Sequence, residues 1–98
     1  MFDEQAAEIL GTTDLIAERV RKIGHATLRS IGEVSKRQTV KDNNADFVKP
    51  GDMLEELRAD NLALVESLRA IKELTDAAKD NATDGIVDDW TDQAEQRA

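Results

Sequence analysis

Apolar or small residues recur at every third or fourth position through the first 23 residues. The positions are Phe2, Ala6, Ile9, Thr13, Ile16, Val20 and Ile23. This spacing places their side chains along one side of a helix, so it predicts an α-helix over residues 1–23. Gly24 follows the last apolar position, as glycine often does at the end of a helix.

Residues 24–51 lack such a period and predict a long crossover connection. Within it, Ser30 and Glu33 have the S-x-x-E spacing of a capping box, which indicates a short helix over residues 31–37. The NN and PG dipeptides that follow are typical of loops. A connection of this length is expected to cross from one end of a helical bundle to the other, or to cover an interface.

A second long apolar seam predicts the longest helix, over about residues 53–78. Asp52 and Glu55 supply an N-terminal capping signal for it. The seam contains one polar residue, Asn61, which could set the register or face a partner. The seam positions are Leu54, Leu57, Asn61, Leu64, Leu68, Ile71, Thr75 and Ala78.

A shorter apolar pattern predicts the last helix, over about residues 82–98, with Asn81 and Asp84 at its start. Its apolar side consists of Ile86, Val87, Trp90 and Ala94. Trp90 is interpreted as a core residue. The three long helices and one short helix predict an all-α fold built around helix–helix packing.

Composition narrows the class of protein. The 98 residues suffice for one small domain, and the absence of cysteine excludes disulfides and thiolate metal sites. No apolar run is long enough to span a bilayer, and the opening MFDEQ is not a secretory signal, so a cytoplasmic location is expected. The net charge of −8 repels phosphate backbones and attracts cations.

Three carboxylates lie along one line of the first helix, namely Asp3, Asp14 and Glu18. They fall roughly 100–160° around the helix from the apolar seam, and about 16 Å of helix rise separates Asp3 from Asp14. One chain therefore cannot join them around one ion. Two copies of the helix packed antiparallel, crossing near Gly11, would bring Asp3 of one copy to Asp14 and Glu18 of the other. Such clusters suit hard cations such as iron(II) or magnesium.

Simpler interpretations of the charged residues remain open. Glu18 could pair with Arg21 or Lys22 one turn later, and the acidic line could be a solvated helix face. His25 follows Gly24 and is interpreted as a helix-end residue rather than a ligand. The weakly basic loop residues do not predict DNA contact by so acidic a chain; they are Lys36, Arg37, Lys41 and Lys49.

The segment DLIAERVRKIGH, followed by a T-L-x-S-I-x-E continuation, resembles the Dps family (DNA protection during starvation) of ferritin-like proteins. The segments GDMLEELRADNLALVESLRAI and DNATDGIVDDWTDQAEQRA look like the third and fourth helices of that family. The resemblance covers essentially the whole chain, in order. It implies a ferritin-like four-helix bundle that here lacks the first helix.

The resemblance also implies roles for the carboxylates. Asp14 and Glu18 match the carboxylates of an intersubunit ferroxidase site, and Asp3 matches a third iron ligand from the twofold mate. Asp80 and Asp84 match acidic residues of an iron-entry pore. The implied activity is that of a ferroxidase, a peroxide-driven oxidoreductase that binds iron and stores it in a bacterial, dodecameric shell.

Two further expectations follow from the resemblance. The full-length protein would protect DNA from oxidative damage, and a nucleoid association is conceivable for it. The family's two ligand histidines lie on the first helix and four residues before the Asp3 position, so this chain contains neither.

Two other classes of function place different demands on the sequence. The chain is alternatively a non-catalytic helical oligomerisation or interaction module, whose acidic lines are only solvated faces. A bacterioferritin-like site within one subunit would need E-x-x-H motifs, and the sequence contains none.

Overall fold

The computed structural model describes residues 1–98 and is entirely helical, which confirms the predicted all-α class. The helices are α1 (Phe2–Lys22), α2 (Ile31–Arg37), α3 (Pro50–Ala77) and α4 (Asn81–Arg97). The chain forms two compact units. One unit, Met1–Lys41, contains α1 and α2, and the other, Asp42–Ala98, contains α3 and α4. None of the helices combines the length and the apolar character that a membrane span requires.

The end of α1 at Gly24 follows the sequence pattern. The Gly24 N–H donates to the carbonyl of Arg21, and the His25 N–H donates to the carbonyl of Val20, both at 3.0 Å. This pair of bonds is a Schellman motif, and Gly24 has the positive φ of 91° that the motif requires. The backbone of His25 thus belongs to the end of the helix.

The short helix α2 has the predicted bounds. The side-chain oxygen of Ser30 accepts a hydrogen bond from the Glu33 N–H at 3.1 Å, as the capping box predicts. The reciprocal bond differs, because the Glu33 carboxylate accepts from the backbone N–H of Arg29 at 2.8 Å rather than from Ser30. Glu33 is therefore committed to the backbone that leads into the helix.

The start of α3 corrects the prediction. The helix begins at Pro50 instead of about Met53, and Lys49 is its N-cap residue, without a side-chain hydrogen bond. Proline suits the first helical position, since its φ is already helical and no N–H is required there. The PG dipeptide therefore belongs to the first turn rather than to the loop. Asp52 does not cap the helix; it lies in the first turn, where the helix dipole favours a negative charge.

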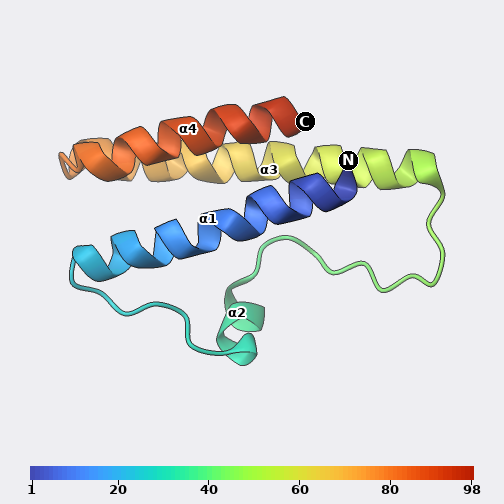
Figure 1. The fold of residues 1–98 in the computed structure, drawn as a ribbon, viewed down its shortest axis with the longest axis horizontal. Helices are drawn as coiled ribbons and strands as arrows, with labels where there is room; N and C mark the ends of the chain where they lie inside the picture. Colours follow the sequence, from blue (N-terminus) through green and yellow to red (C-terminus); the bar gives the residue numbers. More distant parts are fainter. The chain divides into compact units, whose positions relative to one another are not determined.

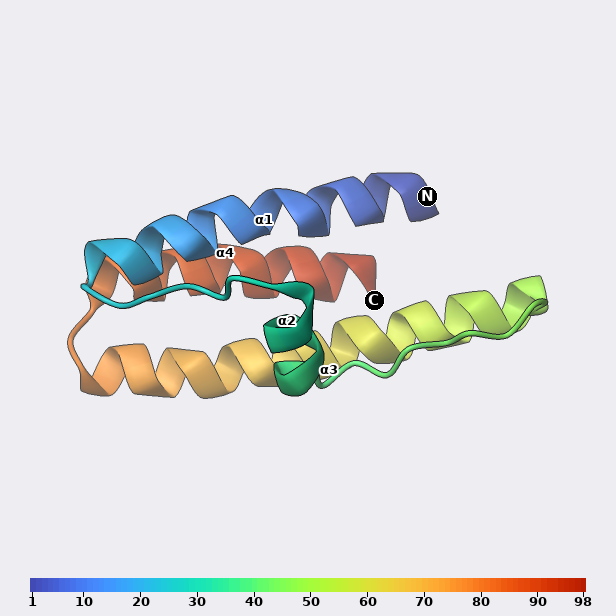
Figure 2. The same cartoon turned by 90° about the horizontal axis from the view of Figure 1, so that it is seen from below.

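Helices α3 and α4 lie side by side in opposite directions and form a hairpin (Figure 1). Its buried core consists of Val65, Leu68, Val87 and Ala94. Leu64 and Trp90 are partly buried and pack against this core, so Trp90 lies at the edge of the core for which it was predicted. Because α3 is eleven residues longer, its N-terminal turns extend past the end of α4 (Figure 2).

The buried polar residue of the seam fixes the far end of this hairpin. Asn61 is only 2% exposed. Its side-chain nitrogen donates to the carbonyl of Leu57 at 2.9 Å, and its oxygen accepts from the Arg97 guanidinium at 3.0 Å. A buried amide needs such partners, because an unsatisfied polar group is costly. Asn61 therefore aligns the last turn of α4 with the middle of α3.

The turn between α3 and α4 is also a Schellman motif, but without glycine. The N–H groups of Lys79 and Asp80 donate to the carbonyls of Asp76 and Thr75. Lys79 takes the left-handed position, with φ of 57°. The start of α4 also differs slightly from the prediction. Asp80, rather than Asn81, is the N-cap residue, because its carboxylate accepts from the Thr83 N–H.

We expect Lys79→Gly to stabilise the hairpin by about 0.5–1 kcal/mol. The left-handed backbone conformation costs a residue with a Cβ about 1–2 kcal/mol, and glycine avoids this cost. The greater flexibility of glycine in the unfolded chain offsets part of the gain. The midpoint of urea unfolding measures the change. Lys79→Ala is the matched control, because alanine keeps the Cβ and should give no gain. Equal effects of the two substitutions would show that the lysine side chain, and not the backbone conformation, determines the difference.

Candidate metal centre

The three carboxylates singled out on α1 are all exposed. Asp3, Asp14 and Glu18 take part in no hydrogen bond or ion pair of the chain. The simple alternative for Glu18, an ion pair with Arg21 or Lys22, is thus not formed. Glu18, Arg21 and Lys22 instead line an open hollow together with Ala17 and Thr27. The carboxylates of Asp3, Asp14 and Glu18 are therefore not occupied by cations of their own chain.

A single chain does not bring these carboxylates together. It contains no group of three or more His, Asp or Glu side chains that could hold a metal ion. Asp3 and Asp14 lie on one continuous helix, about 16 Å apart along its axis. A site built from all three carboxylates would consequently need residues from two chains.

The helix surface between the carboxylates is small and apolar. Leu10 is 70% exposed, and it lies within about 20° of Asp3 around the helix. A Cβ on Gly11 would meet no atom within 4 Å, so packing within the chain does not require a glycine here. A mid-helix glycine costs about 1 kcal/mol relative to alanine. Exposed leucine and unexplained glycine together favour contact with another backbone at this place.

Two threonines next to this surface satisfy their hydroxyl groups within the helix. The hydroxyl of Thr12 donates to the carbonyl of Ile9, and that of Thr13 donates to the carbonyl of Leu10, both at 2.7 Å. Their polar atoms therefore turn toward the backbone. The hydroxyl groups of Thr12 and Thr13 are therefore not free to bind a neighbour, and the polar groups available near Gly11 are carboxylates such as Asp14.

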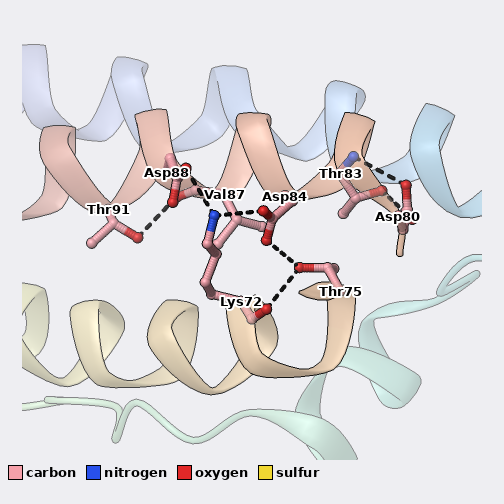
Figure 3. A network of polar contacts seen from close by, with 8 residues as sticks. All are labelled: Lys72, Thr75, Asp80, Thr83, Asp84, Val87, Asp88 and Thr91. Carbon is pink, nitrogen blue, oxygen red and sulfur yellow. Dashed lines mark hydrogen bonds and ion pairs between the residues drawn. The ribbon is translucent and has the colours of Figure 1, made fainter. Parts of the chain in front are cut away.

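A second acidic group, at the start of α4, has a different environment (Figure 3). The Lys72 ammonium contacts the carboxylates of Asp84 at 2.6 Å and Asp88 at 2.9 Å. The other oxygen of Asp84 accepts from the Thr75 hydroxyl at 2.8 Å. Hydrogen bonds from Lys72 and then Thr75 hold the pKa of Asp84 below its ordinary value. The bonds to Asp84 and Asp88 raise the pKa of Lys72.

Asp80, the other residue assigned to an iron-entry pore, caps α4. Its two carboxylate oxygens accept from the N–H of Thr83 at 3.2 Å and from the Thr83 hydroxyl at 2.6 Å. Both oxygens of Asp84 are likewise engaged within the hairpin. The pore role of Asp80 and Asp84 stays a prediction, and a cation at either carboxylate would compete with these internal partners.

Lys72 was not identified from the sequence, although a signal for it exists. In an antiparallel hairpin, residues equally far from the turn lie opposite one another. Lys79 marks this turn. Lys72 lies seven residues before it, and its partners Asp84 and Asp88 lie five and nine residues after it, on either side of the opposite position. Asn61 and Arg97, each eighteen residues from Lys79, contact one another in the same way. Locating the turn at Lys79 would therefore have placed Lys72 opposite the stretch of α4 between Asp84 and Asp88.

Comparison with known proteins agrees with this architecture. A family model described as ferritin-like domain matches residues 1–98. The crystal structure of a Dps protein from Bacillus brevis superposes with a TM-score of 0.92 at 25% sequence identity. That match covers 98% of this chain but 64% of the Dps chain, so the present chain spans less than two thirds of its length. No curated protein sequence matches. Because the family match extends over every residue, the chain belongs to the ferritin-like domain family, and it has the helical fold of a Dps protein.

Proposed function

We propose that this chain binds iron(II) between two copies of α1 and oxidises it for storage, as the Dps resemblance implies. The observation that supports the proposal most directly is the set of three exposed, unpaired carboxylates on one line of α1. In a twofold dimer, Asp14 and Glu18 of one copy would hold the ion with Asp3 of the other. An isologous dimer makes this contact twice, so each dimer would have two sites.

The chemistry of the ligands suits this substrate. Carboxylate oxygens are hard ligands that bind iron(II) and also stabilise the iron(III) that forms. Each iron(II) gives up one electron, and hydrogen peroxide takes two electrons and two protons to form water. The carboxylates would hold iron(II) during this reaction, and storage of the iron(III) would protect DNA from oxidative damage. The resemblance also implies two ligand histidines, neither of which occurs in this chain.

Association and iron binding are expected to depend on one another. Residues 1–18 contain five acids and no base, so an antiparallel pair of these segments brings like charges together. A cation between them removes this repulsion. By linkage, a ligand that binds only the dimer must stabilise the dimer.

The test is an anaerobic titration with iron(II), with the mass of the protein followed by sedimentation. We expect iron binding and the increase in mass to reach saturation together. Each molecule of added peroxide should then oxidise two bound iron ions. Iron binding without association would contradict the intersubunit site. Association without any response to iron would favour the alternative function, a helical interaction module, for which the exposed Leu10 is the supporting observation.

A further inference from the structure

The charges of the chain are segregated along the sequence. Residues 1–18 carry a net charge of −5, residues 19–41 carry seven Lys or Arg and one acid, and residues 42–98 carry fifteen acids and six bases. The segment 19–41 thus has a net charge of +6, although the chain as a whole has −8. We call residues 19–41 the basic segment. The overall acidity conceals this strongly positive surface.

The cations of the basic segment are available for a partner. Six of them are exposed and make no ion pair in the chain: Arg21, Lys22, Arg29, Lys36, Arg37 and Lys41. The one acid of the segment, Glu33, accepts a hydrogen bond from the backbone instead. The positive charge is therefore not neutralised locally.

Apolar side chains lie among these cations. Ile31 at the start of α2 is 90% exposed, and Leu28 and Val34 are about half exposed. A phosphate backbone offers nothing for such groups, whereas a protein surface with acidic and apolar residues matches both features. Each basic segment is also joined to a unit with a net charge of −9, which disfavours a long polyanion nearby. The chemistry of the segment fits an acidic helix.

Such a helix face exists on α3. Four carboxylates lie within about 60° around the helix, along about 32 Å of its length. They are Asp52, Glu55, Glu66 and Glu73, and we call them the acidic line. All four are exposed and lack a hydrogen-bond or ion-pair partner. Leu62 lies about 20° beyond this arc and is 41% exposed. The cation nearest the line, Arg69, is already paired with Glu95 at 2.8 Å.

We propose that the basic segment of one copy docks on the acidic line of a second copy. The two surfaces match in charge and in their apolar residues, and both are present in every copy at equal concentration. The contact is heterologous, because different surfaces of the two copies meet, and repetition of such a contact closes a ring when the rotation permits. This inference does not depend on the iron site, because it uses no residue of that site.

The test uses charge reversal in the full chain, with a chelator present so that metal-linked association is absent. One variant is Lys36→Glu with Arg37→Glu, and the other is Glu66→Lys with Glu73→Lys. Sedimentation gives the association constant at ionic strengths of about 0.05 M and about 0.5 M. Charges are screened over ~10 Å at about 0.1 M, so attraction between exposed charges is strong at the lower ionic strength and weak at the higher one. We expect the wild type to associate at the lower ionic strength and to dissociate at the higher one. Each variant alone should associate at least about tenfold more weakly.

The decisive sample is an equimolar mixture of the two variants. The reversed charges are complementary again between them, so the mixture should regain the association that each variant loses. Lys36→Gln with Arg37→Gln provides a milder variant, should negative charges at the end of α2 unfold that helix, and circular dichroism reports the helix content. Asp76→Asn with Asp92→Asn, two exposed acids outside the acidic line, is the matched control.

Two results would overturn the inference. One is association that neither salt nor charge reversal changes, together with a mixture that behaves like its components. The other is a wild-type chain that stays monomeric at both ionic strengths but binds a duplex oligonucleotide, with binding lost in the Lys36→Glu and Arg37→Glu variant. The basic segment would then serve nucleic acid rather than a second copy.

Discussion

Replacing Asp14 by Asn and Glu18 by Gln is expected to abolish iron(II) binding by this chain without changing its helix content. Both side chains are exposed and unpaired, so neither contributes a contact that the fold would lose. Surface substitutions of this kind usually change the free energy of unfolding by less than about 0.5 kcal/mol. Removing a residue that only supports a metal ligand lowers metal affinity about 10–100-fold. Asp14 and Glu18 are proposed as direct ligands, so the loss of affinity should be larger.

The same substitutions should have the opposite effect on association in the absence of metal. They remove two negative charges from a surface where two acidic segments would meet, so the repulsion between copies decreases. The double variant is therefore expected to dimerise at least as well as the wild type in chelator, but to show no response to iron. This reversal distinguishes a ligand role from a purely structural one.

Anaerobic calorimetry with iron(II), combined with sedimentation, measures both effects. Asp76→Asn with Asp92→Asn is again the matched control, since it removes the same charge from exposed acids outside α1. The control should bind iron as the wild type does. Unaltered iron binding by the Asp14 and Glu18 variant would assign these residues to a solvated helix face and would favour the interaction module.

The sequence was sufficient to predict the helices because its periodic patterns and end signals are local. Gly24 and the Ser30–Glu33 pair act within a few residues, and both were predicted at the correct positions. The errors occurred where two local signals compete. Pro50 fits a loop and the first turn of a helix equally well, and only the conformation of the preceding residues decides between these outcomes.

The partners of the acids were harder to predict than the helices. The Lys72 ammonium reaches Asp84 and Asp88 only because the turn at Lys79 folds α4 back along α3. That turn has lysine where glycine is usual, so the expected sign of a helix end was absent from the sequence. The carboxylates of α1 present the reverse case. Their positions on the helix are local, but their proposed partners belong to another chain.

The largest stability effect is expected in the hairpin core. Leu68 is 6% exposed and belongs to the cluster that α3 and α4 share. Leu68→Ala should lower the free energy of unfolding by about 2–4 kcal/mol, because it removes buried methyl groups and leaves a cavity. The core contains few buried residues, and a small domain has only about 5 kcal/mol or somewhat more in total. This one change should therefore remove much of the stability of the unit.

Leu74→Ala is the matched control, because it makes the same change on the same helix at a side chain that is 71% exposed. In the isolated chain it should cost less than about 0.5 kcal/mol, as exposed positions usually do. Urea unfolding at several protein concentrations compares the two variants. An equal loss from both would contradict the assignment of Leu68 to the principal core. A loss from Leu74→Ala that appears only at high concentration would instead show that a neighbouring copy covers Leu74, because association stabilises the folded state in proportion to the area that it buries.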